Sequence, residues 1–266
     1  MSITLRTKEQ KEPLIQLIGK DLPAFFHMDR SLNLGRPLIL SDDKDCLMTQ
    51  DSPTEPMWIW TSQTISDESL EEMIFSLSAL RAEENLRAIV SKKQIAKLIS
   101  LAFENEIERK QRILVYELKT LQPAKAEGKC IPGAEVEPDI AGDLIAMMMK
   151  ENGEELSAVR RNSLGTAFSQ SPDSFAWRTE TGEIASIARI ARLGNRYAEV
   201  HTVITEPELR NHGYAQALLT EISLLILSEG LTPMLYADRD YLPSNAVYRK
   251  IGFSVKDQLT AVRFRK

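Results

Sequence analysis

The segment best suited to chemistry is a glycine-containing loop between a predicted strand and a predicted helix. The loop reads Arg210-Asn211-His212-Gly213-Tyr214-Ala215, and it leads into an apolar-striped run that ends at Ser228. The first turn of a helix has unpaired backbone N–H groups and the positive end of the helix dipole, which suit a phosphate or pyrophosphate. Gly213 stands where backbone would approach such a ligand. An ordinary strand–loop–helix connection with a turn glycine would explain the same residues.

Two further groups of side chains have types that suit proton transfer. Asn245 and Tyr248 lie one helical turn apart in a helix predicted at 244–250, so both face the same side. Alternation along a strand predicted at 197–205 puts four side chains on one face: Glu199, His201, Val203 and Thr205. Carboxylates, imidazoles and phenols can all move protons at a reacting group. The alternatives without chemistry are a packed Tyr248 and a solvent-facing Glu199.

The order of these motifs resembles the GNAT superfamily of acyl-CoA-dependent N-acetyltransferases. The phosphate loop of that family reads Arg/Gln-x-x-Gly-x-Gly/Ala, and the segment from Arg210 to Ala215 matches it, with Ala215 in place of the second glycine. Downstream the family often has Asn, then an aromatic residue, then Gly-Phe or Gly-Tyr, and here Asn245, Tyr248 and Gly252-Phe253 follow. The resemblance covers residues 175–266 and is similar to a subgroup that has an additional N-terminal half.

The resemblance implies an α/β mixed-sheet GNAT fold that binds acetyl-CoA as a cosubstrate. The backbone N–H groups of the loop would hold the pyrophosphate, and the preceding strand would pair with the pantetheine arm like an added strand. Asn245 would hydrogen-bond the pantetheine or the chain near it. The residues expected to contact the cofactor are Val203, Ile204, Thr205, Arg210, Asn211, His212, Gly213, Tyr214, Ala215 and Asn245.

The implied reaction is direct attack of a deprotonated amine on the thioester. Tyr248 matches the family's general acid, which would protonate the departing thiolate, and Glu199 matches the base glutamate of histone-acetyltransferase members. His201 or a chain of waters is the alternative base. A non-catalytic acyl-CoA-binding sensor or scaffold is the alternative function, but the presence of Asn245 and Tyr248 favours an enzyme. The sequence does not identify the acceptor amine, which a small molecule or a protein would carry.

The elements that must position these residues alternate between strand and helix. In the C-terminal half we expect a helix at 140–151, strands at 174–179, 183–191 and 197–205, a helix at 213–228, a strand at 233–238, a helix at 244–250 and a strand at 253–264. The N-terminal half repeats the strand–helix–strand–helix–strand order of the C-terminal half. We expect these elements at 57–61 (strand), 67–81 (helix), 87–91 (strand), 92–105 (helix) and 112–118 (strand). Prolines and glycines between 122 and 139 mark a boundary.

We therefore expect a degenerate GNAT-like domain at 1–135 and a catalytic GNAT domain at 136–266. The turn from Ser62 to Ser66 has no glycine, so the first domain is not expected to bind a pyrophosphate. Its expected role is to shape the acceptor site, with Trp58 and Trp60 either lining that site or packing in the core. An unrelated α/β cap is the alternative for this half.

Composition argues against several other classes. The chain has 33 Lys and Arg against 38 Asp and Glu, a net charge of −5, which argues against binding to nucleic acid or an anionic membrane. No apolar stretch approaches the ~20 residues of a membrane span, and the N-terminus does not resemble a secretion signal. Cys46, Cys130 and three scattered histidines form no metal motif. We expect a cytoplasmic, metal-free protein of undetermined oligomeric state.

Overall fold

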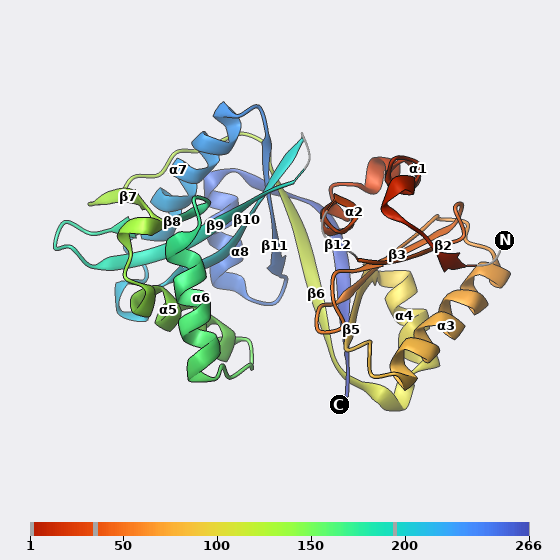
Figure 1. The fold of residues 1–266 in the computed structure, drawn as a ribbon. Helices are drawn as coiled ribbons and strands as arrows, with labels where there is room; N and C mark the ends of the chain where they lie inside the picture. Colours follow the sequence, from red (N-terminus) through yellow and green to blue (C-terminus); the bar gives the residue numbers. More distant parts are fainter. Residues whose placement is uncertain (1–2, 34–36, 194–195, 266) are drawn as a thin grey trace. The chain divides into compact units, whose positions relative to one another are not determined.

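The computed structural model, drawn in Figure 1, describes residues 3–33, 37–193 and 196–265. The chain falls into two compact units, and neither is one continuous stretch. The first unit consists of residues 1–115, 237–241 and 255–266, and the second consists of residues 116–236 and 242–254. We expected a single boundary after residue 135. The compact units differ from that expectation because most of the last strand joins the first unit and residues 116–135 join the second.

The first unit is built on a mixed sheet. In sheet order its strands are β1 (Thr4–Leu5), β2 (Leu38–Ser41), β3 (Cys46–Gln50), β4 (Met57–Thr61), β5 (Ala88–Lys92) and β12 (Phe253–Phe264). Its helices are α1 (Lys11–Ile18), α2 (Phe26–Asn33), α3 (Asp67–Ala82) and α4 (Lys93–Ala102). Neighbouring strands are antiparallel except β4 and β5, which are parallel.

Alternation along β4 sends its side chains into two different layers. Ile59 joins the buried core that also contains residues of α3 and α4. Trp58 faces the other way and stacks on His27 of α2, with ring centroids 4.5 Å apart. Trp60 donates a hydrogen bond from Nε1 to Asp21 Oδ2 at 3.1 Å. Both tryptophans therefore pack against the N-terminal helical segment, which favours core packing over a role in an acceptor site.

The second unit also has a mixed sheet. In sheet order its strands are β11 (Thr232–Asp238), β10 (Tyr197–Thr205), β9 (Ile184–Leu193), β8 (Ser174–Arg178) and β7 (Lys129–Pro132). The last two residues of β11 are assigned to the first unit. Its helices are α5 (Pro138–Glu151), α6 (Ala158–Gln170), α7 (Tyr214–Ser228) and α8 (Leu242–Ile251). The β10–β11 pair is parallel and the others are antiparallel. A further strand, β6 (Ile107–Leu118), begins in the first unit and ends in the second.

Helix α6 is the main element that the sequence pattern does not predict. Only Gly165 and Phe168 of this helix are buried, so it has no apolar stripe. It approaches α5 through glycine instead, because a Cβ at Gly165 would lie 2.0 Å from the carbonyl oxygen of Pro138. Close helix packing through a glycine leaves no periodic apolar signal in the sequence.

The same order of elements occurs twice along the chain. The series β4–α3–β5–α4–β6 has its counterpart in β10–α7–β11–α8–β12, and in each series the first two strands are parallel neighbours. The expected mixed α/β fold is thus confirmed. The assignment of a catalytic half and a degenerate half stays a prediction. Among the described residues, no helix combines the length and the apolar character needed to cross a bilayer.

Candidate functional site

The predicted phosphate loop lies between the end of β10 and the start of α7. Gly213 is the N-cap of α7 and has φ +84°, a left-handed conformation that favours glycine. A Cβ placed there would be in ordinary van der Waals contact with Lys125 O at 3.9 Å and the Ala126 side chain at 4.0 Å, so sterics alone do not require glycine here. No side chain in the described part of the chain caps α7. The glycine is needed for the backbone angle, and it leaves the first turn of α7 without a covering side chain.

The equivalent helix of the first unit begins differently. Ser66 is the N-cap of α3, and its Oγ accepts a hydrogen bond from the backbone N–H of Ser69 at 3.2 Å. A side-chain oxygen thus occupies the position that an anion would take at a bare helix start. This difference supports the expectation that the first unit holds no pyrophosphate.

Arg210 anchors the loop to the rest of the second unit. Its Nη2 donates to Glu151 Oε1 at 2.7 Å, and its Nε donates to Thr205 O at 3.2 Å. The guanidinium of Arg210 therefore links the end of α5, the end of β10 and the loop. Within the loop, the ring of His212 stacks on that of Tyr214, with centroids 5.8 Å apart. A direct contact between Arg210 and the cofactor stays a prediction.

Strand β10 contains a bulge that the sequence pattern does not predict. Its pairing with β9 reaches His201↔Arg189, and the next pair is Ile204↔Ile187, so β10 has one extra residue. Thr202, inside the bulge, has φ +55°, which is unusual for a β-branched residue. Its Oγ1 lies 2.9 Å from Nδ1 of His201.

The bulge overturns the expectation that Glu199, His201, Val203 and Thr205 share one face. Directly opposite residues of paired strands lie on the same face of a sheet. The pairing therefore puts Glu199 and His201 on the face of Ile204, and Thr205 on the opposite face. Alternation fails here because an extra residue reverses the side of every later side chain.

Strands β10 and β11 diverge just beyond Glu199. The two strands pair only from Tyr197↔Thr232 to Glu199↔Met234, although β10 continues to Thr205. The second half of β10 thus lies where an extended ligand can add to the strand through backbone hydrogen bonds. Val203, Ile204 and Thr205, which we expect to contact the cofactor, lie in this part of the strand. Glu199 is only 6% exposed and sits at the last pair before the divergence.

Helix α8 presents Asn245 and Tyr248 to a third residue, Tyr116 of β6. The hydroxyl of Tyr116 donates to Asn245 Oδ1 at 2.8 Å, and the rings of Tyr116 and Tyr248 have centroids 5.8 Å apart. The prediction that Asn245 and Tyr248 face the same side is therefore confirmed. Tyr248 also meets Phe253 edge-on. Sequence reasoning missed Tyr116, because its only signal is an aromatic residue in an apolar strand far from the motifs.

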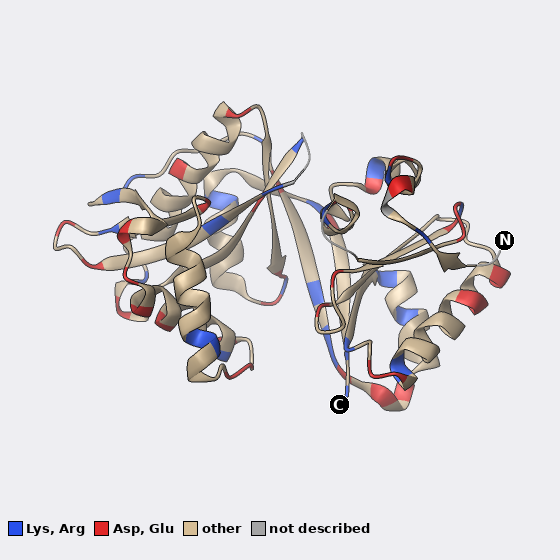
Figure 2. Ribbon diagram, viewed as in Figure 1, with Lys and Arg blue, Asp and Glu red and all other residues tan. Residues whose placement is uncertain are grey.

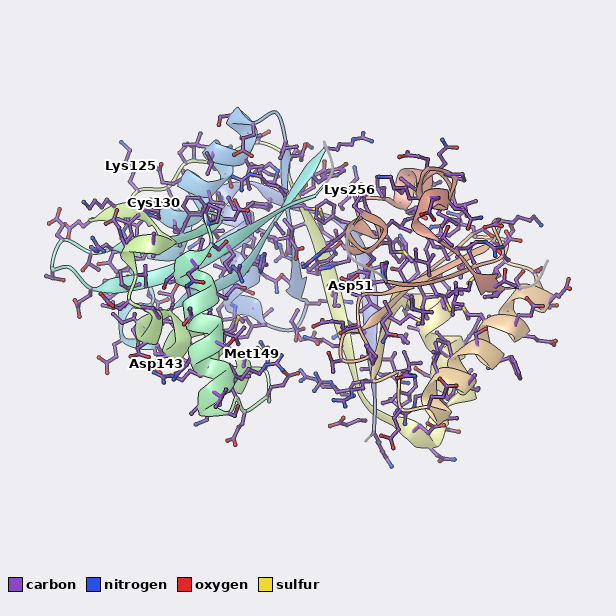
Figure 3. The ribbon with its side chains drawn as sticks, viewed as in Figure 1. Asp51, Lys125, Cys130, Asp143, Met149 and Lys256 are labelled. Carbon is purple, nitrogen blue, oxygen red and sulfur yellow. The ribbon has the colours of Figure 1, made fainter. Side chains whose placement is uncertain are left out.

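The two thiols are poor candidates for an acyl carrier. Burial raises the pKa of the Cys46 thiol far above its usual value, and burial together with the charge of Glu221 raises the pKa of the Cys130 thiol to about 11. Cys130 lies on β7 (Figure 3). Because the thiolate is the nucleophilic form, both groups are unreactive near neutral pH. No group of metal-ligating side chains occurs among the described residues.

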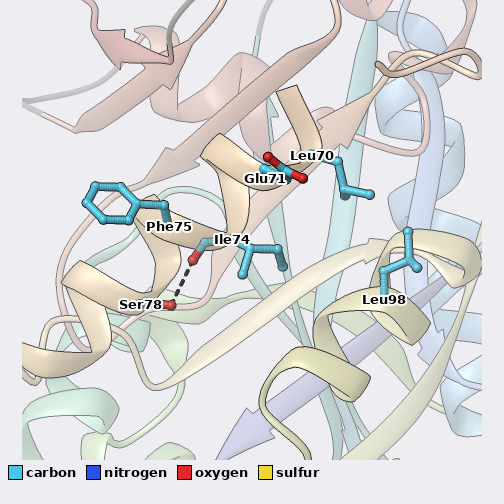
Figure 4. Close-up of a pocket in the computed structure, with 6 residues that line it drawn as sticks. All are labelled: Leu70, Glu71, Ile74, Phe75, Ser78 and Leu98. Carbon is cyan, nitrogen blue, oxygen red and sulfur yellow. Dashed lines mark hydrogen bonds between the residues drawn. The ribbon is translucent and has the colours of Figure 1, made fainter. Parts of the chain in front are cut away.

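Two surface features lie apart from these residues. The ribbon in Figure 2 shows basic and acidic residues interspersed along the elements of each unit. Several of them form ion pairs, such as Arg192–Glu229. An apolar groove between α3 and α4, shown in Figure 4, is lined by Leu70, Glu71, Ile74, Phe75, Ser78 and Leu98. The groove belongs to the first unit and contains none of the predicted site residues.

Comparison with known proteins gives one family match and many similar folds. The family model described as FR47-like protein matches residues 178–262. A GCN5-related N-acetyltransferase from Sphaerobacter thermophilus has 12% sequence identity and a TM-score of 0.68, over 98% of this chain and 94% of that one. An acetyltransferase of the GNAT family from Colwellia psychrerythraea has 10% identity and a TM-score of 0.57, over the full length of both chains.

A tandem GNAT protein from the clavulanic acid biosynthesis pathway has 12% identity and a TM-score of 0.59, over 99% of this chain and 98% of that one. No sequence match was found among curated proteins. At these low identities the similar structures establish the fold rather than a substrate. The resemblance to the GNAT superfamily is therefore confirmed: the whole chain has a GNAT fold, and residues 178–262 match the FR47-like family.

Proposed function

We propose that the protein is an N-acetyltransferase whose second unit binds one acetyl-CoA and transfers the acetyl group to an amine. The observation that carries this proposal is the start of α7, where Gly213 is a left-handed N-cap with φ +84° and the first turn has no side-chain cap. This helix start follows directly on the part of β10 that has diverged from β11. Both features lie inside the segment that matches the FR47-like family.

The cofactor would be held mainly by backbone. The N–H groups from His212 to Ala215 would bind the pyrophosphate, helped by the dipole of α7. Val203 and Thr205 would hydrogen-bond the pantetheine arm along β10, and Asn245 would hydrogen-bond it from α8. Acetyl-CoA supplies an activated thioester, and the role of the protein is to align it and to manage two protons.

Glu199 and Tyr248 are the residues to which we assign these protons. A neutral amine must lose a proton as it attacks, and the buried side chain of Glu199 would accept it, directly or through water or His201. The thiolate that leaves needs a proton, which the phenol of Tyr248 would donate. The raised pKa values of both thiols support direct transfer over an acyl-cysteine intermediate.

The test is acetyl-CoA binding by the full chain and by two matched variants. Gly213→Glu places a side chain and a negative charge at the proposed pyrophosphate position, so binding measured by calorimetry should be lost. Gly230→Glu is the control, because Gly230 follows the end of the same helix, has φ +75° and, like Gly213, has no atom close enough to clash with a Cβ. Both changes strain the backbone alike, but only Gly213→Glu should abolish binding.

Ligand binding should also raise the melting temperature. A ligand at ~100 times its dissociation constant stabilises the folded state by ~2.7 kcal/mol. Transfer is then measured against a panel of amines by chromatographic detection of free CoA and of the acetylated amine. Equal acetyl-CoA affinity in Gly213→Glu and the parent chain would show that the loop is misassigned. Binding without transfer to any amine would favour the sensor alternative.

A further inference from the structure

Tyr116 is buried in the second unit and touches both of the α8 residues in the proposed site. Its side chain is fully enclosed, its hydroxyl donates to Asn245 Oδ1 at 2.8 Å, and its ring packs against that of Tyr248. It comes from β6, outside the segment that matches the FR47-like family. Tyr116 belongs to none of the motifs found in the sequence.

The hydrogen bond at the phenol determines which end of the Asn245 amide it holds. The partner of the phenol is Oδ1 of Asn245 at 2.8 Å, and an amide oxygen can only accept. The phenolic proton of Tyr116 therefore goes to Oδ1 of Asn245. The carbonyl end of the amide is held by Tyr116, so the amide nitrogen is directed to the other side. Burial raises the pKa of Tyr116, with Arg249 opposing the shift, so the phenol keeps its proton at neutral pH.

The backbone that follows Tyr116 is attached to the end of α8. Lys119 N donates to Gly252 O at 3.2 Å, and Gln122 N donates to Ile251 O at 2.8 Å. A Cβ at Gly252 would lie 1.9 Å from Thr120 O, so only glycine permits this approach. Tyr116 is therefore placed against α8 by contacts on its own chain segment as well as by its ring.

We propose that Tyr116 is a positioning residue that orients the Asn245 amide, and with it the Tyr248 ring, for acetyl-CoA. The proposal rests on the proposed function. With Oδ1 held by Tyr116, Asn245 would act toward acetyl-CoA as a hydrogen-bond donor through Nδ2, so its partner would be a carbonyl oxygen of the pantetheine arm. Residue 116 thus belongs to the working site although it lies before the expected catalytic domain.

The main test is a double-mutant cycle on acetyl-CoA affinity with Tyr116→Phe and Asn245→Ala. Tyr116→Phe removes one hydroxyl and keeps the ring, so we expect acetyl-CoA affinity to fall about five- to tenfold, as for one mispositioned hydrogen bond. In the Asn245→Ala background the same change should have almost no further effect. Tyr197→Phe is the matched control, since Tyr197 is also a buried tyrosine of this unit and has no assigned contact with the cofactor.

Three outcomes would overturn the proposal in distinguishable ways. Additive losses in the cycle would show that Tyr116 acts only on general stability. An unaltered affinity in Tyr116→Phe would show that its hydroxyl does not orient Asn245. A parent chain that binds no acetyl-CoA would reject the proposed function, and this inference with it.

Asn245→Asp tests the polarity of the amide without altering Tyr116. Its carboxylate can still accept the hydrogen bond from Tyr116, but it has no Nδ2 to donate. A carboxyl at this buried position should lower the melting temperature, so affinity is measured well below the transition, where we expect it to fall at least as far as in Tyr116→Phe. Parent-like affinity in Asn245→Asp would contradict the proposed donor role, even if Tyr116→Phe did not fold.

Discussion

At the scale of single residues, the structure separates side chains that one motif had grouped together. Gly213 provides a left-handed backbone angle, whereas Arg210 binds Glu151 and the carbonyl of Thr205. Asn245 and Tyr248 are both almost completely buried and share Tyr116 as a neighbour. The loop thus contains one residue kept for its conformation and another that ties the loop to its surroundings.

Tyr248→Phe tests the acid role at this scale. The ring remains and only a hydroxyl is lost, so the packing against Tyr116 and Phe253 should persist. If the phenol protonates the thiolate, single-turnover transfer should slow by about 10²-fold or more, with little change in acetyl-CoA affinity. Single-turnover rates are the measurement to use, because product release can hide a slower chemical step. Tyr241→Phe, at a half-exposed tyrosine, is the control. A full rate in Tyr248→Phe would leave this tyrosine with a packing role only.

At the scale of elements, the bulge in β10 decides which side of the sheet each of its later side chains faces. One extra residue at Thr202 places Glu199 and His201 on one side and Thr205 on the other. The same bulge lies where β10 has already left β11. A bulge bends its strand and interrupts pairing, so it fits a strand whose second half is kept available for a ligand.

Thr202→Gly should therefore behave unlike a usual strand-to-glycine substitution. Glycine adopts φ near +55° without the penalty that a β-branched residue carries, about 1–2 kcal/mol. We expect the melting temperature to stay the same or to rise, even though the contact with His201 is lost. Thr260→Gly, in the regular ladder of β12 with β5, should instead destabilise by roughly 0.5–1 kcal/mol. Equal losses in the two variants would show that Thr202 is not strained.

At the scale of the whole molecule, the compact units do not coincide with the two halves of the sequence. β12 comes last in the chain, yet it pairs with β5 and places Val262 and Phe264 in the core of the first unit. Residues 116–135 precede the expected catalytic domain, yet they belong to the second unit. A fragment of residues 1–135 would lack one strand of its sheet and part of its core. The function of the first unit therefore has to be tested in the full chain.

The assignment of β12 to the core of the first unit can be tested with the same Val→Ala change at two positions of that strand, in Val262→Ala and Val255→Ala. Val262 is fully buried, whereas Val255 is 47% exposed. We expect Val262→Ala to destabilise the first unit by about 1.5–3 kcal/mol and Val255→Ala to have little effect. Urea unfolding followed by tryptophan fluorescence in a Trp177→Phe background reports on the first unit, because Trp58 and Trp60 both lie there. Similar losses for both variants would argue that β12 is not part of that core.

The sequence by itself determined the α/β class, most helices and strands, the glycine at the start of α7, and the shared side of Asn245 and Tyr248 on α8. These features depend on interactions between residues close in the chain, such as apolar periodicity, a glycine at a helix start and one turn of helical spacing. Spacing along α8 was enough to place Asn245 and Tyr248 on one side, because a helix has a fixed period.

Only the tertiary structure decided the bulge at Thr202, helix α6, the contact with Tyr116 and the composition of the two units. Each depends on residues far apart in the sequence. The bulge exists only relative to β9, α6 packs through Gly165 onto the start of α5, and Tyr116 meets Asn245 across 129 positions. Local periodicity contains no information about such partners, because a strand, a glycine or a tyrosine has the same local pattern whichever segment it contacts.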